Sequence, residues 1–292
     1  MINAKLVKEL RDITGAGMMD CKRALVETNG NIEEAITWLR EKGISKAAKK
    51  QDRIAAEGIV TYEVEGNKAL VFELNTETDF VAKNQLFLDI THEIGQTILK
   101  SDATNDEEAL NVEVGGLKVS DMVINAIAKI GEKISLRRVH VFHKTDSQVF
   151  GLYSHMQGKI VALSVLEGAN EDVARDVCMH IAAMNPKYLD ILSVDPVDVE
   201  KEKAILTQEA LNEGKPANIV EKMVVGRVQK YLKEICLVNQ PFVKDPDKTV
   251  EQYVKEHNGK ILTYLRLEVG EGIEKRKDDF AAEVMAATCG CK

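Results

Sequence analysis

Three short helices are predicted at the start of the chain, because apolar residues recur there every three or four positions. We expect these helices over residues 3–15, 18–28 and 31–43. The first and the third begin at an asparagine that can cap a helix, and both end at a glycine. The next residues, 45–53, are small or charged and have no apolar periodicity. We interpret them as a linker.

The apolar period changes from about four residues to two after Gly58, which predicts a β-hairpin. Apolar and polar residues alternate as far as residue 64, a turn is expected at 65–67, and residues 69–75 return as the second strand. A helix should begin at about Thr78. The same reasoning predicts a helix over 120–130, capped by Ser120 and closed by Gly131, and a strand over 134–142.

The hairpin and its helix recur once along the chain. A shift of 92 residues aligns several like residues without gaps: Gly66 with Gly158, Leu74 with Leu166, Val81 with Val173, Ala82 with Ala174, and Lys83 with Arg175. These pairs fall on a shared order of hairpin and then helix. They predict two similar α+β subdomains that pack side by side.

A helical hairpin is predicted within the second subdomain. Its first helix opens at Asp195 and Pro196 and ends at Gly214, and Pro216 starts a second helix that lasts to about residue 235. The apolar stripe is sparse: Ile205, Leu206 and Leu211 on the first helix, and Val220, Val224, Val228, Tyr231 and Ile235 on the second. This favours an arm, or a surface for another chain, over a core element.

The remaining pattern predicts a helix near 248–255, a strand over 261–270, and a last amphipathic helix with Phe280, Val284 and Met285. The fold class is therefore α+β. The expected divisions are a three-helix domain at 1–45, a linker at 46–56, a first core subdomain at 57–139, a second core subdomain at 140–190 and 234–268, the arm at 191–233, and a C-terminal module at 269–292.

Composition and charge narrow the function classes. The chain has 292 residues, 45% of them apolar, and a net charge of −8. An acidic chain gains little from counterion release on a phosphate backbone, which argues against direct binding of nucleic acid. The start of the sequence lacks a signal-peptide pattern, and no stretch has the apolar length to span a membrane. We expect a cytoplasmic protein.

No motif for catalysis or for a cofactor stands out. The sequence lacks a phosphate-binding loop of the G-x-x-x-x-G-K-[ST] type and a G-x-S-x-G motif. Its histidines do not show metal-ligand spacing except His140 and His143, which alternation along a strand directs to opposite faces. Cys289 and Cys291 could hold a metal or be redox-active, but without a second pair or a nearby histidine we interpret them as part of a disordered tail. We therefore expect no cofactor, no bound metal and no enzymatic activity, although a site assembled in space would leave no local signature.

Six segments, in order along nearly the whole chain, closely resemble the bacterial elongation factor Ts family: residues 6–25, 75–84, 128–139, 214–227, 239–250 and 266–284. The resemblance implies a three-helix domain like ubiquitin-associated domains, two α+β core subdomains, an inserted antiparallel coiled-coil hairpin and a C-terminal helical module. The chain departs from many family members at Thr76 and Glu77, where Cys and Gln are common.

The function that the resemblance implies is guanine-nucleotide exchange on elongation factor Tu. The chain would bind that partner in its GDP-bound and nucleotide-free forms and displace Mg²⁺ and GDP, so that GTP can bind. A homodimer or a 2:2 complex with elongation factor Tu is compatible with the family. The alternative, from another class, is a polypeptide-binding adaptor that acts through the three-helix domain.

The segment of Thr78, Asp79, Phe80 and Val81 would, by resemblance, enter the nucleotide-binding domain of the partner and dislocate Mg²⁺. Periodicity alone favours another interpretation, because Phe80 lies seven residues before Phe87 and would be a core residue. The repeat places Asp172 at the equivalent position, and aspartate is rarely buried without a partner. That position can therefore be exposed.

Further partner contacts are implied by the resemblance alone: Met18, Met19, Lys22, Ile130, Gly131 and His155. Spacing indicates that one of the two methionines packs inward and that the other is an adaptable surface residue. Gly131 is in any case a helix terminator. Alternation on its strand cannot distinguish a partner contact of His155 from simple exposure.

Overall fold

The computed structural model describes residues 3–214 and 216–274, which form two compact units. Of these residues, unit 1 holds 3–63, 70–141 and 268–274, and unit 2 holds 64–69 and 142–267. The predicted last helix with Phe280, Val284 and Met285 lies outside the described residues, as do Cys289 and Cys291. No helix in the described ranges combines the length and the apolar character needed to cross a bilayer.

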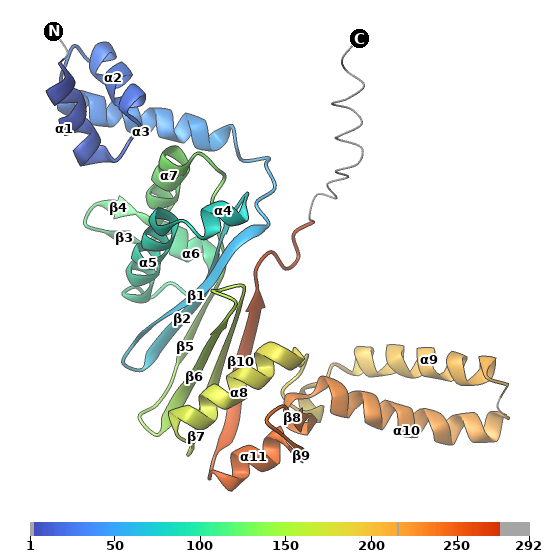
Figure 1. The fold of residues 1–292 in the computed structure, drawn as a ribbon. Helices are drawn as coiled ribbons and strands as arrows, with labels where there is room; N and C mark the ends of the chain where they lie inside the picture. Colours follow the sequence, from blue (N-terminus) through green and yellow to red (C-terminus); the bar gives the residue numbers. More distant parts are fainter. Residues whose placement is uncertain (1–2, 215, 275–292) are drawn as a thin grey trace, which may run out of the picture. The chain divides into compact units, whose positions relative to one another are not determined.

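Unit 1 begins with the three predicted helices, α1 (Ala4–Thr14), α2 (Met18–Glu27) and α3 (Ile32–Ala48) (Figure 1). The side chain of Asn3 accepts a hydrogen bond from the Leu6 N–H at 2.8 Å, and Gly15 ends α1 in the left-handed conformation, as the sequence predicts. The small core of these helices is made of Val7, Leu10, Cys21, Ala24, Leu25 and Ala35.

The third helix does not stop at Gly43, so the predicted terminator and the predicted start of the linker are wrong. Helix α3 continues to Ala48. Gly43 is buried, and a Cβ at this position would lie 3.4 Å from the Cβ of Ala128 in α7 (Val119–Ile130). A Cβ there would meet α7 at van der Waals distance, so Gly43 lies inside α3 where this helix packs on α7, and it does not end the helix.

A three-stranded sheet forms the body of unit 1, in the order β1 (Glu57–Glu65), β2 (Lys68–Thr76), β5 (Ser135–His143). Two helices cover one face of it, α5 (Gln85–Leu99) and α7 (Figure 1). Their apolar side chains meet those of the sheet in a core that includes Leu70, Phe72, Phe87, Ile94 and Ile127. The predicted hairpin and the strand near 134–142 are confirmed.

Two helices differ from the prediction, one by a break and one by its cap residue. The helix expected from Thr78 is split into α4 (Asp79–Ala82) and α5, because Asn84 caps a new helix by accepting a hydrogen bond from the Leu86 N–H at 2.9 Å. Helix α7 begins at Val119 with Lys118 in the cap position, so Ser120 is not its cap. The short helix α6 (Asp106–Asn111) and the small hairpin of β3 (Glu113–Val114) and β4 (Leu117–Lys118) precede it.

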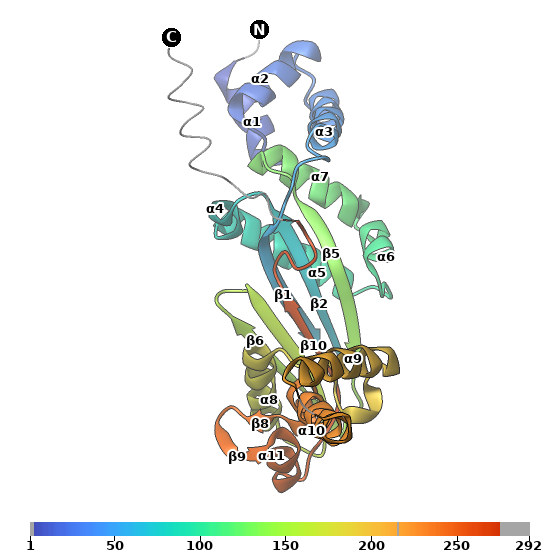
Figure 2. The ribbon, with the colours of Figure 1, turned by 90° about the vertical axis from the view of Figure 1, so that its right-hand side faces the viewer.

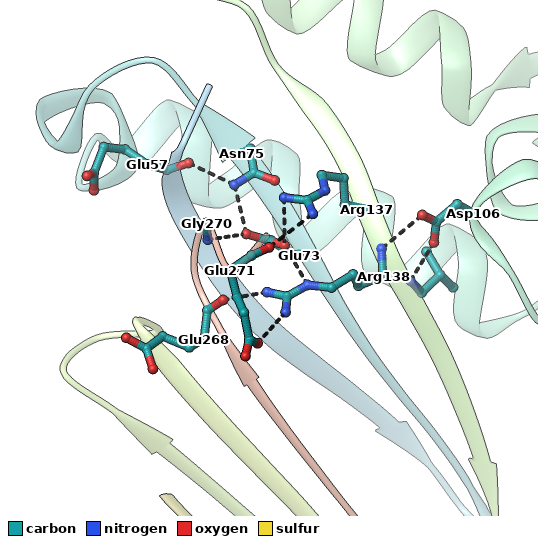
Figure 3. Close-up of polar contacts among 10 residues, drawn as sticks. Glu57, Glu73, Asn75, Asp106, Arg137, Arg138, Glu268, Gly270 and Glu271 are labelled. Carbon is teal, nitrogen blue, oxygen red and sulfur yellow. Dashed lines mark hydrogen bonds and ion pairs between the residues drawn. The ribbon is translucent and has the colours of Figure 1, made fainter. Parts of the chain in front are cut away.

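A buried polar cluster fastens residues 268–271 to the sheet of unit 1 (Figure 3). The Glu73 side chain is fully buried, and its carboxylate accepts hydrogen bonds from the Gly270 N–H at 2.6 Å and from Nε of Arg138 at 2.8 Å. Arg138 also pairs with Glu271 at 2.8 Å. A buried carboxylate needs such partners, and here they are all parts of the chain itself, so the cluster has a structural role.

Unit 2 contains a second three-stranded sheet in the order β10 (Lys260–Glu268), β7 (Ile160–Glu167), β6 (Gln148–His155). Helix α8 (Glu171–Met184) packs on β6 and β7 through Val173, Val177 and Ile181. The short elements η2 (Leu237–Asn239), β8 (Pro241–Phe242), β9 (Asp245–Thr249) and α11 (Val250–Glu256) complete this core. The helix near 248–255 and the strand near 261–270 are confirmed.

The internal repeat is visible in the two sheets. Strands β6 and β7 follow β1 and β2 at the predicted shift of 92 residues, and in each sheet the second strand of the hairpin lies at the centre with a later strand beside it. Each hairpin leads into a helix whose cap residue is equivalent: Thr78 accepts from the Val81 N–H, and Asn170 accepts from the Val173 N–H. The prediction of two similar α+β substructures is confirmed at the level of strand order and helix start.

The predicted helical hairpin is present as α9 (Pro196–Asn212) and α10 (Ala217–Ile235), which run side by side in both views (Figures 1 and 2). Asp195 caps α9 with Pro196 at the first helical position. The seam is formed by Leu206, Ala210, Val220, Val224 and Val228. Ile205 and Leu211, two further apolar residues of the predicted stripe, are exposed and do not belong to this seam.

Candidate functional site

An exposed phenylalanine stands on a short turn of unit 1. Phe80 lies in the four-residue helix α4, and 82% of its surface is exposed to solvent. Val81 and Ala82 on the same helix face the core, and Phe87, seven residues later, is fully buried. The interpretation of Phe80 as a core residue is therefore wrong. The break before Asn84 shifts the helical phase, so seven residues no longer connect the same face. We name residues 76–82 the Phe80 turn.

The start of this turn is held by one carboxylate from another part of the chain, that of Glu132. It accepts four hydrogen bonds: from the Thr76 hydroxyl at 2.7 Å, the Glu77 N–H at 3.0 Å, the Thr78 N–H at 2.9 Å and the Thr78 hydroxyl at 2.7 Å. Glu132 comes directly after Gly131, where α7 ends in a left-handed C-cap. The end of α7 thus places the Glu132 carboxylate, a hydrogen-bond acceptor, beside the start of α4.

The electrostatics of Glu132 agree with this geometry. Partial burial raises the pKa of Glu132, but the hydrogen bonds from Thr78, Thr76 and the two backbone N–H groups together favour the ionised form more strongly, so the pKa lies below its ordinary value. The carboxylate is therefore charged at neutral pH. Its hydrogen bonds are of the stronger, charge-assisted kind.

A second acidic residue, Glu77, extends the connection to the segment after α3. Its carboxylate accepts a hydrogen bond from the Lys133 N–H at 2.6 Å and pairs with Arg53 at 3.2 Å. The Lys133 ammonium group donates to the carbonyl oxygens of Gln51 and Arg53 at 2.6 and 2.8 Å. Residues 51–53, the Phe80 turn and residues 132–133 therefore form one hydrogen-bonded junction in unit 1.

The remaining residues of the predicted segment have plain local roles. Thr78 is the N-cap of α4, because its hydroxyl oxygen accepts from the Val81 N–H at 3.4 Å. Asp79 is partly exposed in the first turn of α4 and pairs with Lys83 at 2.7 Å. Val81 is half-buried against the core of unit 1. Phe80 is thus the residue of this segment that projects into solvent.

Met18 and Met19 open α2, and both are exposed, by 54% and 65% of their surface. The expectation that one of them packs inward is wrong, because the inward positions of α2 are taken by Cys21, Ala24 and Leu25. Lys22 is also exposed. Two neighbouring flexible thioethers at a helix start form an adaptable apolar surface.

Ile130 and Gly131 lie at the end of α7, as the sequence predicts. Ile130 is half-buried and packs on the core of unit 1, while Gly131 is exposed with a φ of 89°. The carbonyl oxygen of Gly131 accepts a hydrogen bond from the Lys50 ammonium group. This places Gly131 in the junction that also holds the Phe80 turn.

His155 belongs to unit 2 and is exposed at the end of β6. Its ring stacks on that of Tyr153, with 5.9 Å between the centroids, and its Nδ1 lies 3.2 Å from the Tyr153 hydroxyl. Met156, the next residue, is 67% exposed. An aromatic pair and an exposed methionine are thus neighbours in sequence at the hairpin between β6 and β7.

Groups suited to covalent or metal chemistry are sparse in the part of the chain that the structure describes. No cluster of three or more His, Cys, Asp or Glu side chains with the geometry for a metal ion occurs among these residues. Cys21, Cys178 and Cys236 are buried, and burial raises the pKa of the Cys178 thiol to about 12. Large apolar side chains that are exposed, such as Phe80, Met18 and Met19, suit contact with another macromolecule.

Sequence reasoning misses Glu132 and Glu77 as parts of the site. The donors that Glu132 binds lie 54 to 56 residues earlier in the chain, so neither spacing nor periodicity can connect them. Two features of the sequence, taken together, give a weak signal that these residues are hydrogen-bonded to each other. An acid directly after a helix-ending glycine, and a cap residue at the end of a strand, both leave hydrogen-bonding groups to be satisfied.

Comparison with known protein families gives one match. The family model described as elongation factor TS matches residues 77–271, which is more than half of the chain. The matched range includes most of the Phe80 turn, Ile130, Gly131, His155 and both helices of the hairpin. Helices α1 to α3, with Met18, Met19 and Lys22, precede it.

Proposed function

Because the chain belongs to the elongation factor Ts family, we propose that it promotes the release of GDP from elongation factor Tu, so that GTP can bind during translation elongation. The observation that carries this proposal is Phe80, a large apolar side chain that is 82% exposed on a hydrogen-bonded turn. Exposure of such a residue is costly in water, and burial in a partner would recover that cost.

The Phe80 turn inserts into the nucleotide-binding domain of the partner and dislocates the Mg²⁺ that holds GDP. Phe80 supplies the apolar contact, Asp79 adds a negative charge beside it, and Thr78 and Val81 anchor the segment in unit 1. By linkage, if this chain lowers the affinity of elongation factor Tu for GDP, then GDP lowers the affinity of elongation factor Tu for this chain by the same factor. The chain therefore binds the nucleotide-free partner most strongly.

Additional contacts come from the other exposed residues. Met18, Met19 and Lys22 meet the same domain of the partner, Ile130 and Gly131 contact it beside the Phe80 turn, and His155 contacts another domain. The exposure of both methionines and of His155 supports these roles. A three-helix fold like ubiquitin-associated domains remains our interpretation of α1 to α3, and a coiled coil remains our interpretation of α9 and α10.

The chain acts by contact and catalyses no covalent step of its own, and it works in the cytoplasm without direct binding of nucleic acid. Exposed apolar residues on the arm, Ile205, Leu211 and Val225, support a homodimer or a 2:2 complex with the partner. The mass of the complex in light scattering distinguishes these assemblies from a 1:1 complex.

Release of labelled GDP from purified elongation factor Tu tests the function. The chain should accelerate release at catalytic amounts, and Phe80→Ala should slow the accelerated reaction roughly thirtyfold, since truncation of an anchor residue at an interface costs about 2 kcal/mol or more. The melting temperature of Phe80→Ala should stay near that of the parent, because an exposed side chain contributes little to folding.

Leu192→Ala is the matched control, because Leu192 is another large apolar residue, 95% exposed, in unit 2. This variant should exchange like the parent chain. If the parent chain itself does not accelerate release, the exchange function is wrong, and binding of unfolded peptides to residues 1–45 would then favour the adaptor alternative. If Phe80→Ala exchanges at the parent rate, the assignment of Phe80 is wrong.

A further inference from the structure

We propose that Glu132 is the positioning residue of Phe80, and that it holds the Phe80 turn in its binding geometry before any partner arrives. The inference rests on the proposed function for its biological meaning, but its physical content concerns the free chain. A side chain that must enter a partner in one orientation gains affinity when that orientation is already populated.

One carboxylate satisfies several groups at the start of the Phe80 turn. Both oxygens of Glu132 are used, Oε2 by the Thr76 hydroxyl and the N–H groups of Glu77 and Thr78, and Oε1 by the Thr78 hydroxyl. These donors belong to the last residue of β2 and the two residues after it. The backbone between the sheet and α4 is therefore fixed at successive residues by a single acceptor.

The Thr78 hydroxyl takes part in two hydrogen bonds with opposite roles. Its proton is donated to Oε1 of Glu132, and its oxygen accepts from the Val81 N–H. Because the proton is committed to Glu132, a lone pair of the oxygen is directed at the start of α4. Each bond strengthens the other, so Glu132 acts on the helix cap through Thr78.

The helix cap in turn determines the position of Phe80. Helix α4 has only four residues, Asp79–Ala82, which is too short to be stable by itself. Its position is determined by its cap at one end and by Val81 and Ala82 on the core. Phe80 lies between these two anchors and projects into solvent. Loss of the cap would therefore increase the motion of Phe80 most directly.

The chain supplies a matched control in Glu108. Its carboxylate accepts from the Thr104 N–H at 2.8 Å and the Thr104 hydroxyl at 2.9 Å, beside the N-cap of α6. Hydrogen bonds from Thr104 lower the pKa of Glu108 as those from Thr78 lower that of Glu132. Glu108 thus makes carboxylate hydrogen bonds of the same kind at the start of another helix, but all of them go to a residue four positions earlier and none to the Phe80 turn.

The experiment places a fluorophore at the position of Phe80. Trp38 is the single tryptophan of the chain, so Trp38→Phe combined with Phe80→Trp yields a protein whose emission reports on position 80. Time-resolved anisotropy should show a larger fast component when Glu132→Ala is added and an unchanged decay when Glu108→Ala is added. Glu132→Gln should fall between, because its amide keeps one acceptor oxygen for the backbone N–H groups and replaces the other, which accepts from the Thr78 hydroxyl, with a donor.

A second measurement uses the chain with Phe80 in place. In the GDP-release assay, Glu132→Ala should raise the concentration of the chain needed for half-maximal exchange about tenfold, while the maximal rate at saturation stays near that of the parent. This change is expected when a smaller fraction of the folded chain has the binding geometry. A general loss of structure would also raise this concentration, but it would lower the melting temperature as well, so the positioning role requires a melting temperature near that of the parent.

The outcomes separate the two proposals. Equal anisotropy decays for the parent and for both Glu132 variants would overturn the positioning role of Glu132. Increased motion in Glu132→Ala with an unchanged concentration dependence would support the positioning role and would contradict the part of Phe80 in exchange. If Glu132→Ala does not fold, the same comparison is made between Glu132→Gln and Glu108→Gln.

Discussion

The two copies of the internal repeat share their strand order and their helix start, and they differ in the helix beyond the cap. In unit 2, α8 runs without a break from Glu171 to Met184 and buries one face on its sheet. In unit 1, the equivalent helix ends after Ala82 and a new one begins at Gln85. The position after the first helical residue is exposed in both copies, as Phe80 in one and as Asp172 in the other.

One scaffold thus carries a continuous packed helix in one copy and, in the other, a short turn with an exposed Phe80, which we propose contacts the partner. Asp172 at an exposed helix start is ordinary, because a negative charge is favourable there. Phe80 at the same place is not explained by folding. The break in the helix and the carboxylate of Glu132 are the two features through which unit 1 presents this side chain on a fixed turn.

The strongest loss of stability should come from Phe87, the core counterpart of Phe80. Phe87→Ala should lower the free energy of unfolding by about 3–5 kcal/mol, because Phe87 is fully buried in the core of unit 1. Phe80→Ala should change it by less than about 0.5 kcal/mol. Urea unfolding followed by circular dichroism measures both. Similar losses in the two variants would show that Phe80 packs inside the protein in solution.

A smaller effect is expected at the equivalent helix caps. Asn170→Ala should cost about 1 kcal/mol of stability, since it removes the acceptor for the Val173 N–H, and should leave GDP release unchanged. Thr78→Ala removes the equivalent cap beside Phe80 and should weaken exchange severalfold. GDP release and urea unfolding, measured for each variant, test both expectations. If Asn170→Ala slowed exchange as much as Thr78→Ala, the proposal that only the cap beside Phe80 matters for exchange would be wrong.

The weakest effect at neutral pH concerns His180, which occupies in α8 the position of Leu88 in unit 1. His180 is fully buried, its Nδ1 accepts from the Val243 N–H at 3.2 Å, and its Nε2 is hydrogen-bonded to Gln240 at 2.8 Å. Both ring nitrogens are thus used by the neutral form. Burial lowers the pKa of His180, against a weaker opposite influence of the bond to Gln240.

The sign of the pH dependence is set by linkage. Above the ordinary histidine pKa of about 6.5, His180 is neutral in the folded and unfolded chain and adds no pH dependence. As the pH falls below that value, the unfolded chain binds a proton that the folded chain does not, so stability is lost. The urea midpoint should drop between pH 7.5 and 5.5, and the drop should be smaller in His180→Gln. Equal drops in both proteins would assign the dependence to other groups.

Much of the fold can be predicted from the sequence because its signals are local. The caps at Asn3 and Asn31, the change of period after Gly58, and the shift of 92 residues all report on contacts within a few residues or on repetition. Local signals fail at Gly43 because a glycine that ends a helix and one that lies inside a packed helix look alike in the sequence. For α9 they leave open which apolar residues face α10, because a sparse stripe does not fix which side of a helix faces its neighbour: Leu206 lies in the seam, and Ile205 and Leu211 are exposed.

The candidate site can be predicted only in part. Periodicity places Phe80 in the core, whereas Asp172 at the equivalent position of the repeat allows exposure and the family resemblance favours it, and neither supplies the physical cause. The cause is the cap at Asn84, which restarts the helix and changes the direction of every later side chain. For Met18 and Met19, apolar character is visible in the sequence, but the number of inward positions on α2 depends on the packing of Cys21, Ala24 and Leu25.

The sequence by itself predicts the α+β class, the repeat, the arm and the resemblance to the family. Each of these predictions depends on residues that are close together in the chain or that recur in a fixed order. Only the tertiary structure shows that Phe80 is exposed and that Glu132 binds the Phe80 turn. The physical reason is that the hydrogen-bond donors of a partly buried carboxylate can come from any part of the chain that folding places beside it. For Glu132 those donors lie more than fifty residues away, beyond the reach of any local pattern.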